Sequence, residues 1–475
     1  MKLSAVYSNR VFSPHIRYVF DWLAENLGMD GAVYFSYDEL RTADLRDSLL
    51  VVYGTLEPVV AMPHIHILES DFFSAQYLNP QSLPQTPLAR WKDLPVLFGS
   101  LPPSGNWIEE REGKIISHAD IIAGIFFLLT RYEEIVIKER DQRMRFPAER
   151  SLLKKEGLLE RAIADEYADL FAEWTGRVRP DFRRKNHWGA HPFALYVTHD
   201  VDAVRKYSWK NLLTSDDKIR ALSSLWGFMP DPYWTFEKLA ETDEKFGIRA
   251  DYFFLAGGSH PLDRPYSIQN RRIQKLIHYL KKRNFGIGIH FSLSAHLRLF
   301  AEGASSAERA ESFSRELDCF NAAAGCPPVG SRQHYLGIRI PETWRQLDAL
   351  GIPFDTTLGF SESPGFRCGT CRPFRCFDAE TGRTLRLVEI PMIAMDASFI
   401  YYLRLSPAEA LEHLCSLMAR VERHGGVFCL LWHTHVFGGD YAGWGGVYRQ
   451  FLETAACKNP FLGHPMRIWT ENGKI

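Results

Sequence analysis

The sequence predicts an α/β protein whose main feature is a parallel sheet, and three observations lead to this fold class. The chain has 475 residues, too many for one ordinary hydrophobic core. Its composition is 46% hydrophobic and 24% charged, as in a well-packed globular protein. From Phe193 onward, short apolar runs alternate with amphipathic stretches, which is typical of parallel strands joined by right-handed crossovers. The pattern fits either a barrel or an open, doubly wound sheet.

The first part of the chain mixes helical and strand patterns. Apolar spacing predicts helices over 19–27, 120–134 and 159–174 and a buried strand over 49–53. The basic stretch 177–185 is typical of a linker. We therefore expect an N-terminal α/β domain over 1–185 and a catalytic domain over 186–475.

The second part alternates more regularly. Strands are predicted at 194–197, 252–255, 287–289, 333–335, 352–354, 387–390 and 427–432. Helices are predicted at 234–246, 268–282, 307–324, 341–350 and 407–424. In either α/β architecture, ligands bind at the carboxyl ends of the strands. Polar residues that directly follow a strand are therefore the candidates for a functional site.

Bulk properties restrict the partners and the compartment. Acidic and basic residues number 57 and 56, so no global charge attracts nucleic acid or an anionic membrane. The most apolar later stretch, 121–129, is half the length of a membrane span, and the N-terminus lacks a secretory apolar region. Eight irregularly spaced cysteines indicate reduced thiols. We expect a cytoplasmic protein without a membrane span; the oligomeric state stays open.

Two carboxylates, Asp200 and Asp202, follow the first predicted strand of the second part. Paired carboxylates can divide labour, one holding a metal ion while the other abstracts a proton. The alternative is helix capping at the entry to the next element. The residues alone leave both interpretations open.

Two further strand ends carry a histidine and an arginine. His290 is a candidate ligand for zinc, cobalt or nickel, although a lone histidine is more often a satisfied polar residue. Position 294, on the same helical face, is Ser294, and the next histidine is His296. Arg332 could orient a carboxylate and lower its pKa, or form a structural ion pair.

The last strands bring acids and imidazoles. Asp355 and Asp396 each follow a strand, where either could orient an imidazole or cap a loop. Strand alternation places His433 and His435 on one side. His433 is suited to protonate a leaving amine as a general acid. An Asp, a His, an Arg and a His after successive strands of one sheet predict a shared site.

These segments resemble known motifs. Thr198-His199-Asp200-Val201-Asp202, the His290 segment, Arg332 and Leu431-Trp432-His433 resemble, in order, those of the NodB-type polysaccharide deacetylases, carbohydrate esterase family 4. Phe354 to Leu358 and Glu389 to Pro391 also look like segments of that superfamily, and the likeness covers about 193–440. Residues 1–185 resemble an uncharacterised domain found ahead of such catalytic domains in bacteria.

The resemblance implies a distorted (β/α) barrel and a hydrolase that removes an N-acetyl or related acyl group from an amino-sugar glycan or glycan precursor. Asp200 would be the general base with Arg332 as its partner, and His433 the general acid. A divalent metal, zinc before cobalt or nickel, would be held by Asp202 and His290. The family's usual second histidine is Ser294 here, so His296 is the predicted third ligand, with His435 or Ser294 as alternatives.

The expected partner is a carbohydrate. Tyr335, Trp432 and His435 are predicted to contact it, since aromatic rings stack on sugar faces. Two alternatives are a carbohydrate-binding pseudoenzyme with an incomplete metal site, which Ser294 favours, and an amidohydrolase of a non-sugar amide. Finally, Cys368-Gly369-Thr370-Cys371 has the spacing of half a zinc knuckle or of a redox pair, but we expect a glycine-turned surface loop near the site.

Overall fold

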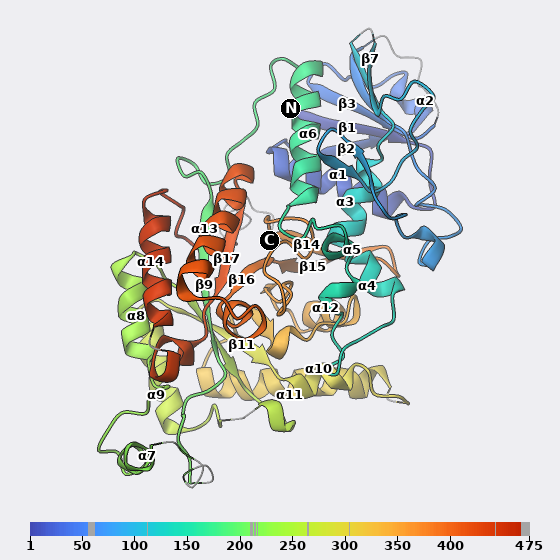
Figure 1. The fold of residues 1–475 in the computed structure, drawn as a ribbon. Coiled ribbons are helices and arrows are strands. Elements are labelled where there is room, and N and C mark those ends of the chain that lie inside the picture. Colours follow the sequence, from blue (N-terminus) through green and yellow to red (C-terminus); the bar gives the residue numbers. More distant parts are fainter. Residues whose placement is uncertain are drawn as a thin grey trace.

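The computed structural model describes residues 1–55, 62–111, 113–209, 212, 215, 217–263, 266–303, 305–441 and 443–466. Two large sheets organise the chain, one in the N-terminal part and one in the C-terminal part (Figure 1). Among the described residues, no helix combines the length and the apolar character needed to cross a bilayer.

The N-terminal part holds a six-stranded sheet in the order β2-β1-β3-β4-β8-β7, parallel except for the β7–β8 pair. Between β4 and β7 in the sequence, β5 and β6 form a separate two-stranded ribbon. The strands are β1 (Lys2–Tyr7), β2 (Ala32–Phe35), β3 (Ser48–Tyr53), β4 (His64–Ile67), β5 (Ala89–Trp91), β6 (Leu94–Val96), β7 (Ile108–Arg111) and β8 (Lys114–Ser117). The helices are α1 (Ser13–Leu27), α2 (Tyr37–Leu40), α3 (Ile121–Leu129), α4 (Tyr132–Val136), α5 (Leu152–Lys155) and α6 (Ile163–Val178).

The C-terminal part holds a nine-stranded sheet in the order β14-β15-β13-β12-β11-β10-β9-β17-β16. Only β14 runs antiparallel to its neighbour. The pairing does not close on itself among the described residues, so this mixed α/β sheet is a curled half-barrel. The strands are β9 (Ala194–Val201), β10 (Asp251–Leu255), β11 (Gly286–Phe291), β12 (Ser331–Gln333), β13 (Phe354–Asp355), β14 (Phe374–Asp378), β15 (Arg383–Glu389), β16 (Met392–Met395) and β17 (Val427–Leu431). The helices are α7 (Lys218–Leu225), α8 (Phe236–Lys245), α9 (Arg271–Lys282), α10 (Leu293–Arg298), α11 (Ser306–Ala324), α12 (Glu342–Ala349), α13 (Pro407–His424) and α14 (Trp444–Ala456).

The two sheets are separated in the sequence between β8 and β9, but one hydrophobic core joins the two parts. Phe126 of α3 packs edge-on against Phe377 of β14, with ring centroids 5.4 Å apart. The boundary at residue 185 stays a prediction, because the side chains on its two sides share a core.

The helix predicted over 120–134 is interrupted. Between α3 and α4, Arg131 adopts a left-handed conformation with φ of 52°. The break turns its guanidinium into a buried network: Arg131 pairs with Glu134 at 2.8 Å, and Glu134 also pairs with Arg367 of the C-terminal part at 2.7 Å. Burial opposes ionisation, yet Arg367 and Arg131 lower the pKa of Glu134 to about 2.

Glu134→Gln is expected to lower the free energy of unfolding by about 3 kcal/mol or more, because it leaves a buried guanidinium without its carboxylate. Chemical denaturation measures the loss. The control is Asp44→Asn, which breaks the exposed Asp44–Arg46 pair and is expected to cost at most about 1 kcal/mol. Equal effects of the two substitutions would contradict the prediction.

The prediction of a surface loop at Cys368–Cys371 is wrong, because both thiols are fully buried. The loop packs against the N-terminal part, where the Thr370 hydroxyl donates to Asp165 at 2.7 Å. Burial raises the pKa of Cys368 to about 12, so this thiol stays protonated. The loop is part of the contact between the two parts of the chain.

Candidate active site

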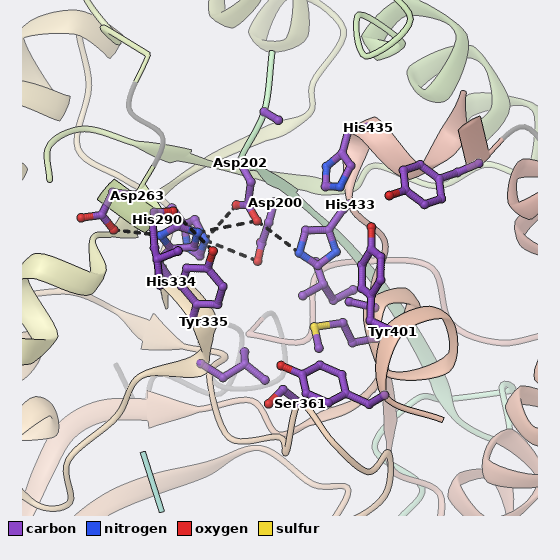
Figure 2. Close-up of a pocket in the computed structure, with 18 of the residues that line it drawn as sticks. Asp200, Asp202, Asp263, His290, His334, Tyr335, Ser361, Tyr401, His433 and His435 are labelled. Carbon is purple, nitrogen blue, oxygen red and sulfur yellow. Dashed lines mark hydrogen bonds and ion pairs between the residues drawn. The ribbon is translucent and has the colours of Figure 1, made fainter. Parts of the chain in front are cut away.

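The carboxyl ends of the central strands meet at a cavity of about 290 Å³. Figure 2 shows Asp200 and Asp202 at its centre, with His290 and His334 on one side and His433 on the other. Parallel register causes this convergence, since His290 of β11 lies beside Arg332 of β12. The predicted meeting of acids and imidazoles at one edge of the sheet is therefore seen in the structure.

Three side chains offer ligand atoms to a metal ion. Asp202, His290 and His334 each present one donor atom, and these atoms lie within 4.8 Å of one another. Asp202 Oδ1 is 3.2 Å from His290 Nε2, and Asp202 Oδ2 is 3.8 Å from His334 Nε2. One carboxylate and two imidazoles, with room left for water, form a common donor set of catalytic zinc sites.

The hydrogen bonds of the two imidazoles fit this use. His290 Nδ1 lies 3.0 Å from the carbonyl oxygen of Arg332, which only accepts, so we assign the ring proton to Nδ1. His334 Nδ1 likewise lies 3.0 Å from Asp263 Oδ1. Rings held this way aim their Nε2 atoms at Asp202, which suits a shared cation.

The electrostatics around Asp202 also favour a cation at this place. Burial opposes ionisation of Asp202, but the nearby imidazoles of His334, His290 and His433 hold its pKa well below its ordinary value. Burial also disfavours a charged His290, yet Asp200 and Asp202 raise its pKa. Asp202 therefore stays ionised and attracts positive charge.

The sequence analysis did not single out His334 as a metal ligand, and its prediction of His296 as the third ligand is wrong. His296 points away from the cavity, with Nε2 3.1 and 3.2 Å from the carbonyl oxygens of Arg143 and Met144. Ser294 does not supply a donor to the cluster either. Its hydroxyl donates to Asp263 Oδ2 at 2.6 Å and so supports the carboxylate that orients His334.

The position of His296 leads to a prediction about stability in acid. Burial lowers the pKa of His296 from 6.5 to about 4. The unfolded chain therefore binds this proton first, and stability that is complete above about pH 6.5 is lost as the pH falls toward 4. Between about pH 7.5 and about pH 5, the free energy of unfolding should fall by on the order of 2 kcal/mol more in the native protein than in His296→Gln. Identical losses in denaturant titrations would show that His296 is not the group responsible.

Asp200 lines the cavity, and Arg332 lies behind it in the sheet. Arg332 Nε lies 3.7 Å from Asp200 Oδ1, and the guanidinium is fully buried. Arg332 Nη2 donates to Thr198 and Thr356, which fixes its orientation. Asp200 Oδ1 accepts no hydrogen bond from the described residues, so it keeps room for a proton.

His433 is held by Asp396. Asp396 Oδ1 accepts from His433 Nδ1 at 2.6 Å, and Oδ2 accepts from the His433 backbone N–H at 2.7 Å. Burial alone would lower the pKa of His433, but Asp396 and Asp202 raise it well above its ordinary value. The Nε2 atom of His433 lies 3.4 Å from Asp202 Oδ2, inside the cavity.

Asp355, the other acid predicted to orient an imidazole, lies away from His433. It is buried in the sheet and accepts hydrogen bonds from Ser331, Gln333 and the backbone of Thr357. It does not line the cavity. The structure thus selects Asp396 as the residue that orients the imidazole, and Asp355 braces the loop after β13.

Two of the three residues predicted to contact substrate line the cavity, namely Tyr335 and His435. Trp432 does not, because it faces the other side of β17 from His433 and packs against Tyr448 of α14. Tyrosines that the sequence analysis did not single out supply more of the wall: Tyr233, Tyr401, Tyr402 and Tyr441.

The N-terminal part also reaches the cavity, through Arg145. Its guanidinium donates to the backbone oxygen of Tyr335 at 3.0 Å and to the Ser361 hydroxyl at 2.7 Å, and pairs with Asp141 and Glu362. These bonds occupy the five donors of the side chain. Arg145 therefore braces the residue next to His334 rather than binding an anion.

Comparisons with known proteins cover the two parts unequally. Residues 4–180 match a family described as a "Family of unknown function (DUF7033)". No curated protein matches the chain.

Solved structures resemble the chain over about 60% of its length. A protein described as a polysaccharide deacetylase from Mycobacterium smegmatis is 19% identical, with 59% of this chain and 90% of that chain covered and a TM-score of 0.41. PuuE allantoinase is 14% identical, with 62% and 96% covered and a TM-score of 0.43. A protein described as a polysaccharide deacetylase from Pseudomonas aeruginosa PAO1 is 13% identical, with 62% and 97% covered and a TM-score of 0.42. These likenesses are distant, so the function has to be argued from the site itself.

Proposed function

We propose that the chain is a metal-dependent hydrolase that removes an N-acetyl or related acyl group from an amino-sugar-containing glycan or glycan precursor. One observation carries the proposal: the donor set Asp202, His290 and His334 lies in one cavity with Asp200 and His433. Amide hydrolysis needs an activated water, a base for its proton and an acid for the leaving amine. The cavity offers a group for each of these tasks.

A divalent cation held by Asp202, His290 and His334 would supply a Lewis acid that polarises the acyl carbonyl and acidifies the attacking water. Asp200 takes the proton of that water on a carboxylate oxygen, while buried Arg332 keeps the carboxylate in place. Imidazole and carboxylate ligands suit zinc, with cobalt or nickel as alternatives.

His433 completes the reaction as the general acid. Its Nε2 atom faces the cavity while Nδ1 donates to Asp396, so the proton on Nε2 is the one available to the leaving nitrogen. The raised pKa of His433 keeps this proton in place near neutral pH.

The surroundings of the cavity support a carbohydrate as the substrate. Tyr335, Tyr401 and Tyr402 line it, and the last two are partly exposed, so they are open to stacking by a sugar ring. We also propose that the protein is cytoplasmic. Its substrate would then be a glycan precursor and not a finished polymer.

The test is acetate release from a panel of N-acetylated glycans and simple amides by the zinc-loaded protein. We expect release from at least one amino-sugar substrate and a loss of about a hundredfold or more in His433→Ala. If acetate were released only from a non-sugar amide, the proposed substrate would be that class of amide and not an amino sugar. Stoichiometric metal without turnover of any substrate would leave the carbohydrate-binding alternative.

A further inference from the structure

Exposed large apolar side chains among the described residues are concentrated in one segment of the chain. Of the eleven large hydrophobic residues with the greatest exposure among the described residues, six lie between 209 and 229. Ile219, Trp226 and Phe228 are 80%, 68% and 82% exposed. We call these six residues the apolar patch; they are Trp209, Ile219, Leu222, Trp226, Phe228 and Met229.

The apolar patch is built on and around α7, which projects from the lower end of the molecule (Figure 1). Only Ala221 of this helix is buried. Trp209 and Trp226 pack edge-to-face, with ring centroids 6.4 Å apart, so the two indoles form one surface. Exposed apolar side chains that gather in this way usually mark an interaction site.

The segment that carries the apolar patch is rich in basic residues. Residues 203–230 contain five Lys or Arg and two Asp, while the whole chain has a net charge of −1. Arg205, Lys218 and Arg220 are exposed. Exposed indole and phenyl rings beside Lys and Arg are typical of surfaces that enter the interface of an anionic bilayer.

The positive charge also argues against a second copy of the chain as the partner that covers the apolar patch. Two such surfaces meeting face to face would bring their basic residues together, which costs free energy. Anionic lipid headgroups neutralise the same residues, and the rings gain an apolar environment.

We propose that the apolar patch, together with the exposed basic residues Arg205, Lys218 and Arg220, docks the protein on an anionic lipid surface. The docking surface lies next to the active site in the chain: Ala203 and Tyr233, on either side of it in the sequence, both line the cavity. A docked enzyme works on substrates exposed at the bilayer surface, and this consequence alone rests on the proposed function.

The test is co-sedimentation of the full chain with vesicles of equal parts phosphatidylcholine and phosphatidylglycerol, compared with phosphatidylcholine alone. The native protein should sediment with the anionic vesicles, and added salt should weaken its binding. The double variant Trp226→Ser/Phe228→Ser should lower the partition coefficient by about tenfold or more. Lys218→Glu/Arg220→Glu should abolish the preference for phosphatidylglycerol.

Val11→Ser is the matched control, because Val11 is 81% exposed but lies in the N-terminal part; it should bind as the native protein does. Circular dichroism melting verifies that every variant is folded. The catalytically impaired His433→Ala should bind fully, which separates docking from turnover. The proposal would be overturned if the native protein did not bind, or if the Trp226→Ser/Phe228→Ser variant bound equally well. It would also be overturned if the native protein were a dimer and the same variant were a monomer.

Discussion

His334→Ala is expected to abolish stoichiometric metal binding, whereas His296→Ala is expected to retain it. The reason is geometric: His334 Nε2 faces Asp202 at 3.8 Å, while His296 Nε2 bonds to backbone carbonyls of the N-terminal part. Elemental analysis after zinc loading, followed by acetate release, measures both effects. Because the cation would activate the water, we expect activity in His334→Ala to fall by about a thousandfold or more.

Asp263→Asn refines the same experiment. Asp263 does not bind the metal in this proposal; it accepts from His334 Nδ1 and orients the ring. Losing such a partner typically weakens metal affinity by about 10–100-fold, so the variant should bind metal more weakly but still bind it. Loss of metal in His296→Ala together with its retention in His334→Ala would contradict the assignment of the third ligand.

Asp396→Asn is expected to lower kcat by about a hundredfold or more and leave the metal content unchanged. Asp396 holds His433 through two hydrogen bonds and raises its pKa. A general acid works only while it is protonated, so activity falls as the pH rises through the pKa of His433. Without the carboxylate that pKa drops, and the alkaline limb of the kcat profile should move to lower pH.

Asp355→Asn is the matched control for this substitution. Asp355 is equally buried and also lies at the carboxyl end of a strand, but its partners are Ser331, Gln333 and Thr357. We expect it to lower the thermal midpoint and leave the alkaline limb where it is. A displaced limb in Asp355→Asn, with an unchanged one in Asp396→Asn, would show that His433 is not the acid oriented by Asp396.

The candidate site could be predicted from the sequence wherever a side chain lies at or just beyond the carboxyl end of a strand. Asp200, Asp202, His290, Arg332 and His433 belong to this group. The carboxyl ends of neighbouring parallel strands lie together, so residues far apart in the chain are gathered by the sheet itself. His334 carried the same signal, as it directly follows β12, but the expected i, i+4 spacing directed attention to positions 294 and 296.

Other features depended on contacts that no local pattern encodes. Strand ends made Asp355 and Asp396 equal candidates, and only the position of each strand in the sheet decided between them: β16, before Asp396, pairs with β17, before His433. Arg145 and the buried Cys368–Cys371 loop depend on how the N-terminal part packs, which spacing within either segment cannot reveal.

The sequence by itself determined the fold class and most of the groups that perform the proposed chemistry, because hydrophobic periodicity and strand-end positions are local properties. The tertiary structure decided which histidine completes the donor set, which acid orients His433, and that the N-terminal part reaches the cavity. These outcomes depend on distances between residues that are 37 to 190 positions apart in the chain, and only the packed chain defines those distances.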